Sequence, residues 1–97
     1  MTMELHQIMR ERRRRAMLDF LKECPGYASN IPIIADVVHS VGIKSTPALI
    51  EESAAWLARK GLIEIIGEGR EVKLTATGLQ VALGRQSVDG IRMPDID

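Results

Sequence analysis

Glycine and proline divide this chain of 97 residues into short segments, and this division most limits what the chain can fold into. The breaks that bound the segments are Pro25, Gly26, Gly42, Pro47, Gly61, Gly67 and Gly84. Proline cannot continue a helix, and glycine adopts the left-handed backbone that ends helices and forms tight turns. We therefore expect one small domain of short helices and strands, with its longest element in residues 2–24.

Residues 2–24 have the spacing of an amphipathic helix. Apolar residues recur at intervals of three and four, at Leu5, Ile8, Met9, Ala16, Met17, Phe20, Leu21 and Cys24. The apolar pattern lapses over residues 10–15, where five of six positions are arginine. At about 1.5 Å per residue the helix would reach about 33 Å, which is longer than so small a domain needs.

Two shorter helices are predicted next. The first spans about residues 32–40, with Asn30 or Ile31 at its N-cap. Its predicted buried stripe is Ile33, Ile34, Val37 and Val38. The second begins after Ser45 and Thr46, because a hydroxyl cap followed by proline at the first helical position is a strong start signal. It ends at Gly61.

The last third of the domain is predicted to hold a β-hairpin and a closing helix. Residues 62–66 and 71–75 are short, apolar-alternating segments on either side of a glycine-containing turn. Thr75 is placed to cap a short helix whose Leu79, Ala82 and Leu83 share one face. The fold class is therefore α+β and mainly α, with a domain over residues 1–84 and an extended tail over residues 85–97.

Two short helices joined by a tight turn, with a hairpin after the second, are the arrangement of a winged helix-turn-helix. The most specific stretches are WLARKGLI at residues 56–63 and LTATGL at residues 74–79. Over residues 8–84 the chain resembles this superfamily, particularly the ArsR/MarR-like bacterial regulators. The resemblance implies three helices, a two-stranded hairpin wing and a short closing helix.

A narrower resemblance rests on the length of the chain and on three further motifs. These are Tyr27-x-x-Asn30, the pair Trp56-Leu57, and VDGIRMP at residues 88–94. In these features the chain is similar to a family of small winged-helix proteins encoded in Mu-like prophages. That resemblance implies a bacterial or phage setting and names no activity.

The superfamily resemblance implies a regulator of transcription that binds duplex DNA, with the third helix in the major groove. On a helical wheel Ile50, Ala54 and Leu57 face the core, and the opposite face carries the residues that would meet DNA. The predicted DNA contacts are Lys44, Ser45, Thr46, Ala48, Glu52, Arg59, Arg70 and Lys73. Arginine can pair with guanine, alanine can approach thymine methyl groups, and hydroxyl and lysine groups contact phosphates.

The charge of the chain favours a different reading. Thirteen basic residues balance thirteen acidic ones, and Glu51 and Glu52 lie on or beside the outer face of the third helix, where phosphates would repel them. A simpler explanation is that both complement the helix dipole from its first turn. The hairpin adds Glu64, Glu68 and Glu71. The alternative function is a winged-helix module that binds protein and not DNA.

The arginine run also has two readings. Arg12, Arg13, Arg14 and Arg15 are candidate contacts to phosphates or to an acidic partner, and the simpler reading is a solvated stretch of helix. Arginines spread over six positions point all round a helix, so they cannot all meet one duplex.

The apolar residues at the two ends of the chain suggest a homodimer. Leu5, Ile8 and Met9 lie beyond what the core needs, and Ile91, Met93 and Ile96 could lie across the same partner. Packing within one copy of the chain is the alternative.

No motif in the sequence indicates catalysis, a cofactor or a metal. No metal-ligand spacing includes His6, His39 or the single cysteine, Cys24. The segment Gly67-x-Gly69 is typical of a turn and does not match a phosphate-binding loop. We expect no leader, and no apolar run reaches the roughly 18 residues that a membrane span needs. We expect a cytoplasmic protein that is not an enzyme.

Overall fold

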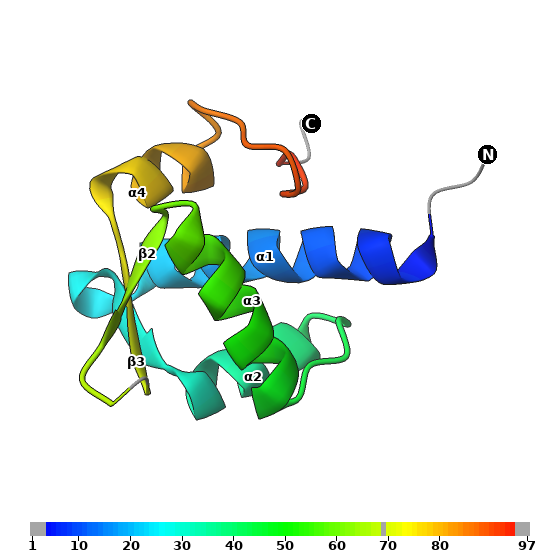
Figure 1. The fold of residues 1–97 in the computed structure, drawn as a ribbon, viewed down its shortest axis with the longest axis horizontal. Coiled ribbons are helices and arrows are strands. Elements are labelled where there is room, and N and C mark those ends of the chain that lie inside the picture. The colour runs from blue at the N-terminus through cyan, green and yellow to red at the C-terminus, as the bar shows by residue number, and fades with distance from the viewer. Residues whose placement is uncertain (1–3, 69, 95–97) are drawn as a thin grey trace.

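The computed structural model describes residues 4–68 and 70–94, which form four α-helices and a three-stranded antiparallel sheet (Figure 1). The protein is thus α+β and mainly helical. In chain order the elements are α1 (Leu5–Glu23), the 3₁₀ turn η1 (Pro25–Tyr27), β1 (Ala28–Asn30), α2 (Ile31–Ser40), α3 (Pro47–Arg59), β2 (Ile63–Ile66), β3 (Glu71–Leu74) and α4 (Ala76–Ala82).

Polar caps begin three of the helices. The Asn30 side chain accepts a hydrogen bond from the backbone N–H of Ile33, at 3.0 Å, at the start of α2. Thr46 and Thr75 do the same for α3 and α4, at 3.2 and 3.0 Å. Each cap satisfies a backbone donor that the first turn of a helix leaves without a partner. The predicted starts of α3 and α4 are confirmed.

The predicted hairpin is present as β2 and β3, but the sheet has a third strand that the sequence analysis did not predict. β1 pairs with β3, with Ser29 opposite Val72, and β3 lies between β1 and β2. The backbone N–H of Ile31 donates to the carbonyl of Arg70 at 3.1 Å, which joins the start of α2 to the hairpin. β1 has only three residues, too few for an alternating pattern to be recognisable.

The core lies between α1, α2, α3, α4 and the inner face of the sheet. The buried stripe of α2 is Ile31, Ile34, Ala35 and Val38. Ile33 is 47% exposed and Val37 is half-buried, so the predicted stripe is rotated from the observed one. In α4, Val81 is buried and Leu83 is exposed, again unlike the prediction. Both errors arise because α2 and α4 are so short that more than one stripe fits their apolar residues.

The segment after α4 folds back over α1 instead of extending away from the domain (Figure 1). The backbone N–H of Arg92 donates to the carbonyl of Glu11 at 3.3 Å, and Ile91 is only 7% exposed. Gly90 has φ +95°, and a Cβ there would lie 2.6 Å from Cζ2 of Trp56, so only glycine fits this close approach. The N-terminal half of α1 projects past the other helices.

Candidate nucleic-acid interface and the arginines behind it

The third helix has the predicted orientation. Ile50, Ser53, Ala54 and Leu57 are buried, and the opposite face is open to solvent. Along that outer face Ala48, Glu52 and Arg59 are exposed and Ala55 is half-buried. The face is therefore accessible over the full length of α3, as a DNA-reading face must be.

The acidic residues of α3 do not complement the helix dipole in the way predicted. The helix begins at Pro47, and its first turn holds no acidic residue. Glu51 and Glu52 lie in the second turn, and the dipole effect falls off within the first turn. Glu52 instead acts electrostatically on Arg13 and Arg14 of α1.

Arg13 is 6% exposed, and its guanidinium faces the connection between α2 and α3. Its Nη2 donates to the carbonyl of Lys44 at 2.8 Å, and its Nε donates to Oγ of Ser45 at 3.3 Å. Ser45 is itself buried. The predicted phosphate contacts of Arg13 and Ser45 are thus at odds with the structure, in which the two residues hold the start of α3 against α1.

Arg15 is 8% exposed and points toward the opposite side of the core. It donates to the carbonyls of Val81 at 2.9 Å and Ala82 at 2.6 Å, and it forms an ion pair with Asp19 at 2.8 Å. The carbonyls at the end of a helix have no partner within the helix, so Arg15 caps the C-terminus of α4. Its predicted phosphate contact also conflicts with the structure.

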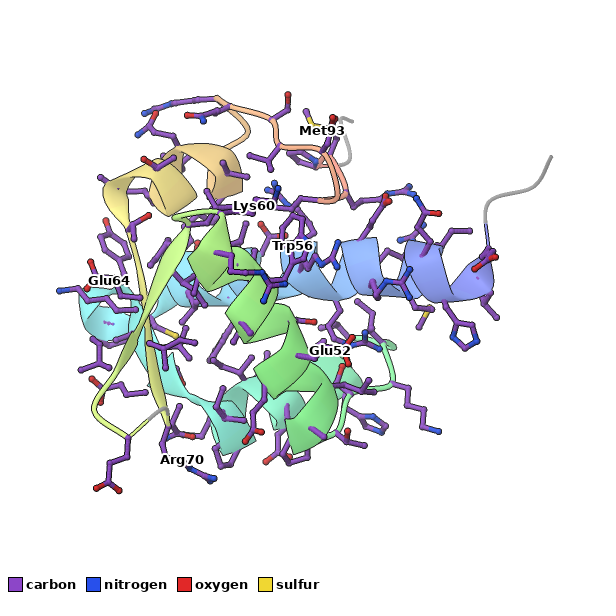
Figure 2. All side chains as sticks on the ribbon, viewed as in Figure 1. Glu52, Trp56, Lys60, Glu64, Arg70 and Met93 are labelled. Carbon is purple, nitrogen blue, oxygen red and sulfur yellow. The ribbon has the colours of Figure 1, made fainter. Side chains whose placement is uncertain are left out.

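Arg14 stacks on Trp56 of α3, with its guanidinium carbon 3.9 Å from the ring centroid. Its Nη1 donates to the carbonyl of Gly90 at 2.9 Å, so one side chain joins α1, α3 and the C-terminal segment. Lys60 also approaches the ring of Trp56, at 5.4 Å (Figure 2). Cation–π contacts of this kind are favourable when the cation is partly withdrawn from water.

Nearby charges act on the two partly buried arginines. Burial lowers the pKa values of Arg13 and Arg14, and Arg10 lowers both further. Glu52 raises the pKa of both, and Glu11 raises that of Arg14 more than Glu52 does. Arginine stays charged in proteins, so these shifts reflect the charges that the groups exert on one another and not deprotonation. Glu52 is thus one counter-charge to these arginines, and Glu11 is another for Arg14.

Arg10 is the residue that the sequence reading missed. It lies one helical turn before Arg14, is half-buried, and belongs to the same electrostatic cluster. The spacing of four residues between Arg10 and Arg14 places both on one side of α1, and this signal was available in the sequence. Arg12 points away from that cluster and is exposed on the outer side of α1.

The remaining predicted DNA contacts lie on the surface. Lys44, Thr46, Arg70 and Lys73 are exposed, and Figure 2 shows Arg70 at the far end of the hairpin. The hydroxyl of Thr46 accepts the capping hydrogen bond of α3. Lys73 lies opposite Glu64 in the register of the hairpin.

The predicted dimer contacts divide into two groups. Leu5 is 69% exposed and Met93 is 51% exposed, and Ile8 and Met9 are half-buried. Ile91 is buried in the core of its own chain, which conflicts with its predicted contact to a second copy. Ile96 lies outside the described residues.

Within residues 4–68 and 70–94, no three His, Cys, Asp or Glu side chains gather as metal ligands would. In the same ranges no helix combines the length and apolar character needed to span a membrane.

Comparison of the chain with models of protein families, with curated proteins and with solved structures finds no match. The functional inferences below therefore rest on the residues of this chain.

Proposed function

We propose that this chain is a winged helix-turn-helix protein that binds duplex DNA as a regulator-like module, with α3 in the major groove and the β2–β3 hairpin as the wing. The order of α2, a short turn, α3 and an antiparallel hairpin supports this arrangement. β1 adds a strand to the far side of β3 and leaves the hairpin turn accessible.

The observation that carries the proposal is the outer face of α3. It bears the small side chains of Ala48 in the first turn and Ala55 after Glu52, which let the helix backbone approach base edges closely. Lys44 precedes the helix and Arg59 lies in its last turn, so exposed positive charge stands at both ends. A helix of 13 residues is about 20 Å long, enough for its two ends to reach the phosphates on either side of a groove about 12 Å wide.

One of the two carboxylates of α3 opposes binding less than the sequence suggests. Glu52 lies near Arg13 and Arg14, whose positive charges offset part of its negative charge. Glu51 lines a groove between α3 and the hairpin together with Arg70 and Glu68, so it still opposes the approach of a phosphate.

Fluorescence anisotropy with a mixed-sequence duplex, measured over a range of salt, tests the proposal. Each phosphate contact contributes about −0.9 to the slope of log K against log salt, which is about 3.5-fold in affinity between 50 and 200 mM. We expect a slope near −3 from Lys44, Arg59 and Arg70, and a decrease of about one unit for each Lys→Ala or Arg→Ala change among them.

Lys22→Ala is the matched control, because this lysine is on the C-terminal half of α1 and pairs with Glu23 at 3.8 Å. It removes one positive charge and should leave the slope unchanged. Absence of binding at the lowest salt would overturn the DNA proposal, and so would a slope that Lys22→Ala lowers as much as Lys44→Ala does.

A second candidate is a winged-helix module that binds protein, which the charge balance of this surface favours. Residues 44–75 contain five basic and five acidic residues. The basic set is Lys44, Arg59, Lys60, Arg70 and Lys73, and the acidic set is Glu51, Glu52, Glu64, Glu68 and Glu71. A surface of zero net charge suits a protein partner better than a polyanion. For this candidate we expect no duplex binding even at low salt.

A further inference from the structure

A groove runs along the side of α1 that faces away from α3. Arg14 contacts Trp56 of α3, and Arg12 and Ala16 lie two residues before and after Arg14, about 200° round the helix. Ala16 forms the floor of the groove, because it is half-buried and packs against the core. Two adjoining cavities make up the groove, and Ala16 and Asp19 line both. We call the two cavities together the α1 groove.

The two ends of the α1 groove differ in chemistry. The smaller cavity, of about 350 Å³, lies between α1 and α2, and its walls include the apolar side chains of Phe20, Val37 and Val41. The larger cavity, of about 540 Å³, lies between α1, the connection that follows α2 and the C-terminal segment, where Ile43 and Pro94 form opposite walls. Its lining holds four basic and two acidic side chains. An apolar end therefore adjoins a charged end.

The charged end carries an excess of positive charge. Both acidic side chains of its lining are paired within the groove, Asp19 with Arg15 at 2.8 Å and Glu23 with Lys22 at 3.8 Å. The positive charge in excess includes that of Arg12, whose side chain is exposed. A partner that covers this end is therefore favoured if it brings negative charge.

We infer that the α1 groove binds a short amphipathic helix of a partner protein, one that combines apolar side chains with carboxylates. Its apolar side chains enter the end beside Phe20 and Val41, and a carboxylate pairs with Arg12. An amphipathic helix that lays its apolar face in a groove is a common mode of peptide recognition. The small side chain of Ala16 lets the incoming helix approach α1 closely. The floor from Arg12 to Glu23 is about 16 Å long, which matches three turns of helix.

The partner and a duplex would occupy different faces of the protein. The α1 groove lies across α1 from Trp56, whereas the proposed DNA contacts lie on the outer face of α3 and on the hairpin. The inference therefore does not depend on DNA binding. Three turns of helix bury much less than the about 800 Å² per partner of a standard interface, so we expect a dissociation constant of about 10–100 µM.

Selection of binders from a displayed library of random peptides, each long enough for about three or four helical turns, tests the inference on the full chain. Counter-selection uses the double variant Arg12→Glu/Val41→Ser. Both changed residues are exposed, so the variant should keep the circular dichroism of the original. We expect the enriched peptides to have apolar residues three and four positions apart and an excess of Asp and Glu.

Fluorescence anisotropy with one enriched peptide, made synthetically, measures the two ends of the groove separately. Arg12→Glu should raise the dissociation constant by about tenfold or more, and Val41→Ser by about threefold or more. Arg85→Glu and Leu83→Ser are the matched controls, because they change the same residue types at exposed positions near the end of α4, and each should shift it by less than about twofold. The Arg12→Glu chain should bind a peptide with lysine in place of one acidic residue more tightly than it binds the original peptide.

The inference fails if no peptide is enriched, if the enriched peptides are neutral or basic, or if they bind the Arg12→Glu chain as tightly as the original. It also fails if binding requires the removal of residues 95–97, since the groove would then be occupied by this chain itself. Self-association that Arg12→Glu and Val41→Ser abolish would make a second copy the occupant and overturn the inference as well. None of these outcomes bears on the duplex titration, so this inference and the DNA proposal can fail separately.

Discussion

Replacing Arg15 with methionine tests whether the arginine run belongs to the core. The methionine keeps most of the apolar stem of the side chain and removes the guanidinium that binds the end of α4. Two hydrogen bonds are lost, to the carbonyls of Val81 and Ala82, together with the ion pair to Asp19.

The expected loss of stability is about 2–3 kcal/mol. A hydrogen bond from a charged group contributes about 1.5–3 kcal/mol, so two such bonds set an upper range of about 3–6 kcal/mol. Three effects reduce it. Val81 keeps a second donor, the N–H of Gly84 at 3.0 Å, and the carboxylate of Asp19 is 45% exposed and can be hydrated. Removing the guanidinium also removes the cost of burying its charge.

Urea unfolding followed by circular dichroism and by the fluorescence of Trp56 gives the measurement. A domain of this size has an m-value of about 1 kcal/mol per M, so the midpoint should fall by about 2–3 M with little change in slope. Arg85→Met, at an exposed position, should shift stability by less than about 0.5 kcal/mol. If Arg15→Met is as mild as Arg85→Met, the guanidinium does not hold α4 in place.

Three further changes have defined outcomes. Gly90→Ala would force a Cβ to within 2.6 Å of Trp56 at φ +95°, so the C-terminal segment should lift off and the tryptophan emission should shift to the red; an unchanged spectrum would contradict the close approach. Thr46→Ala removes the cap to the N–H of Leu49 and should cost about 1 kcal/mol in urea unfolding, whereas Thr46→Ser should cost much less. Burial, with a smaller contribution from the nearby Glu23, raises the pKa of the Cys24 thiol, so less reactive thiolate is present at a given pH. Alkylation of the folded protein at pH 8 should be slower than that of the urea-unfolded chain, and equal rates would contradict this.

Most of the element boundaries could be predicted from the sequence because the signals that set them are local. Thr46 followed by Pro47 marks the start of α3, and Thr75 marks the start of α4, through hydrogen bonds that span only three residues. Strand β1 could not be predicted in this way. Its three residues become a strand only because β3, about 40 residues later, offers a free edge.

The roles of the arginines could not be predicted because their partners are distant in the sequence. Arg13 binds a carbonyl 31 residues away, Arg14 one 76 residues away and Arg15 two that are 66 and 67 residues away. A run of charges on a helix normally indicates a solvated face, and nothing in residues 10–15 shows where the ends of other elements will lie. Only the packed fold shows that three guanidinium groups meet backbone carbonyls.

Because these arginines are used inside the fold, fewer basic side chains are available to bind DNA than the balanced net charge implies. Arg13, Arg14 and Arg15 count toward the thirteen positive charges of the chain, but each of them donates to a backbone carbonyl, and Arg13 and Arg15 also bind a hydroxyl and a carboxylate. A duplex would therefore have to be held by the few basic side chains around α3 and the hairpin turn. With so few phosphate contacts, the slope of log K against log salt is shallow. The non-specific attraction to the phosphate backbone then adds little to the affinity. For that reason the slope measured with Lys44, Arg59 and Arg70 variants discriminates between a DNA-binding and a protein-binding module more sharply than a single affinity would.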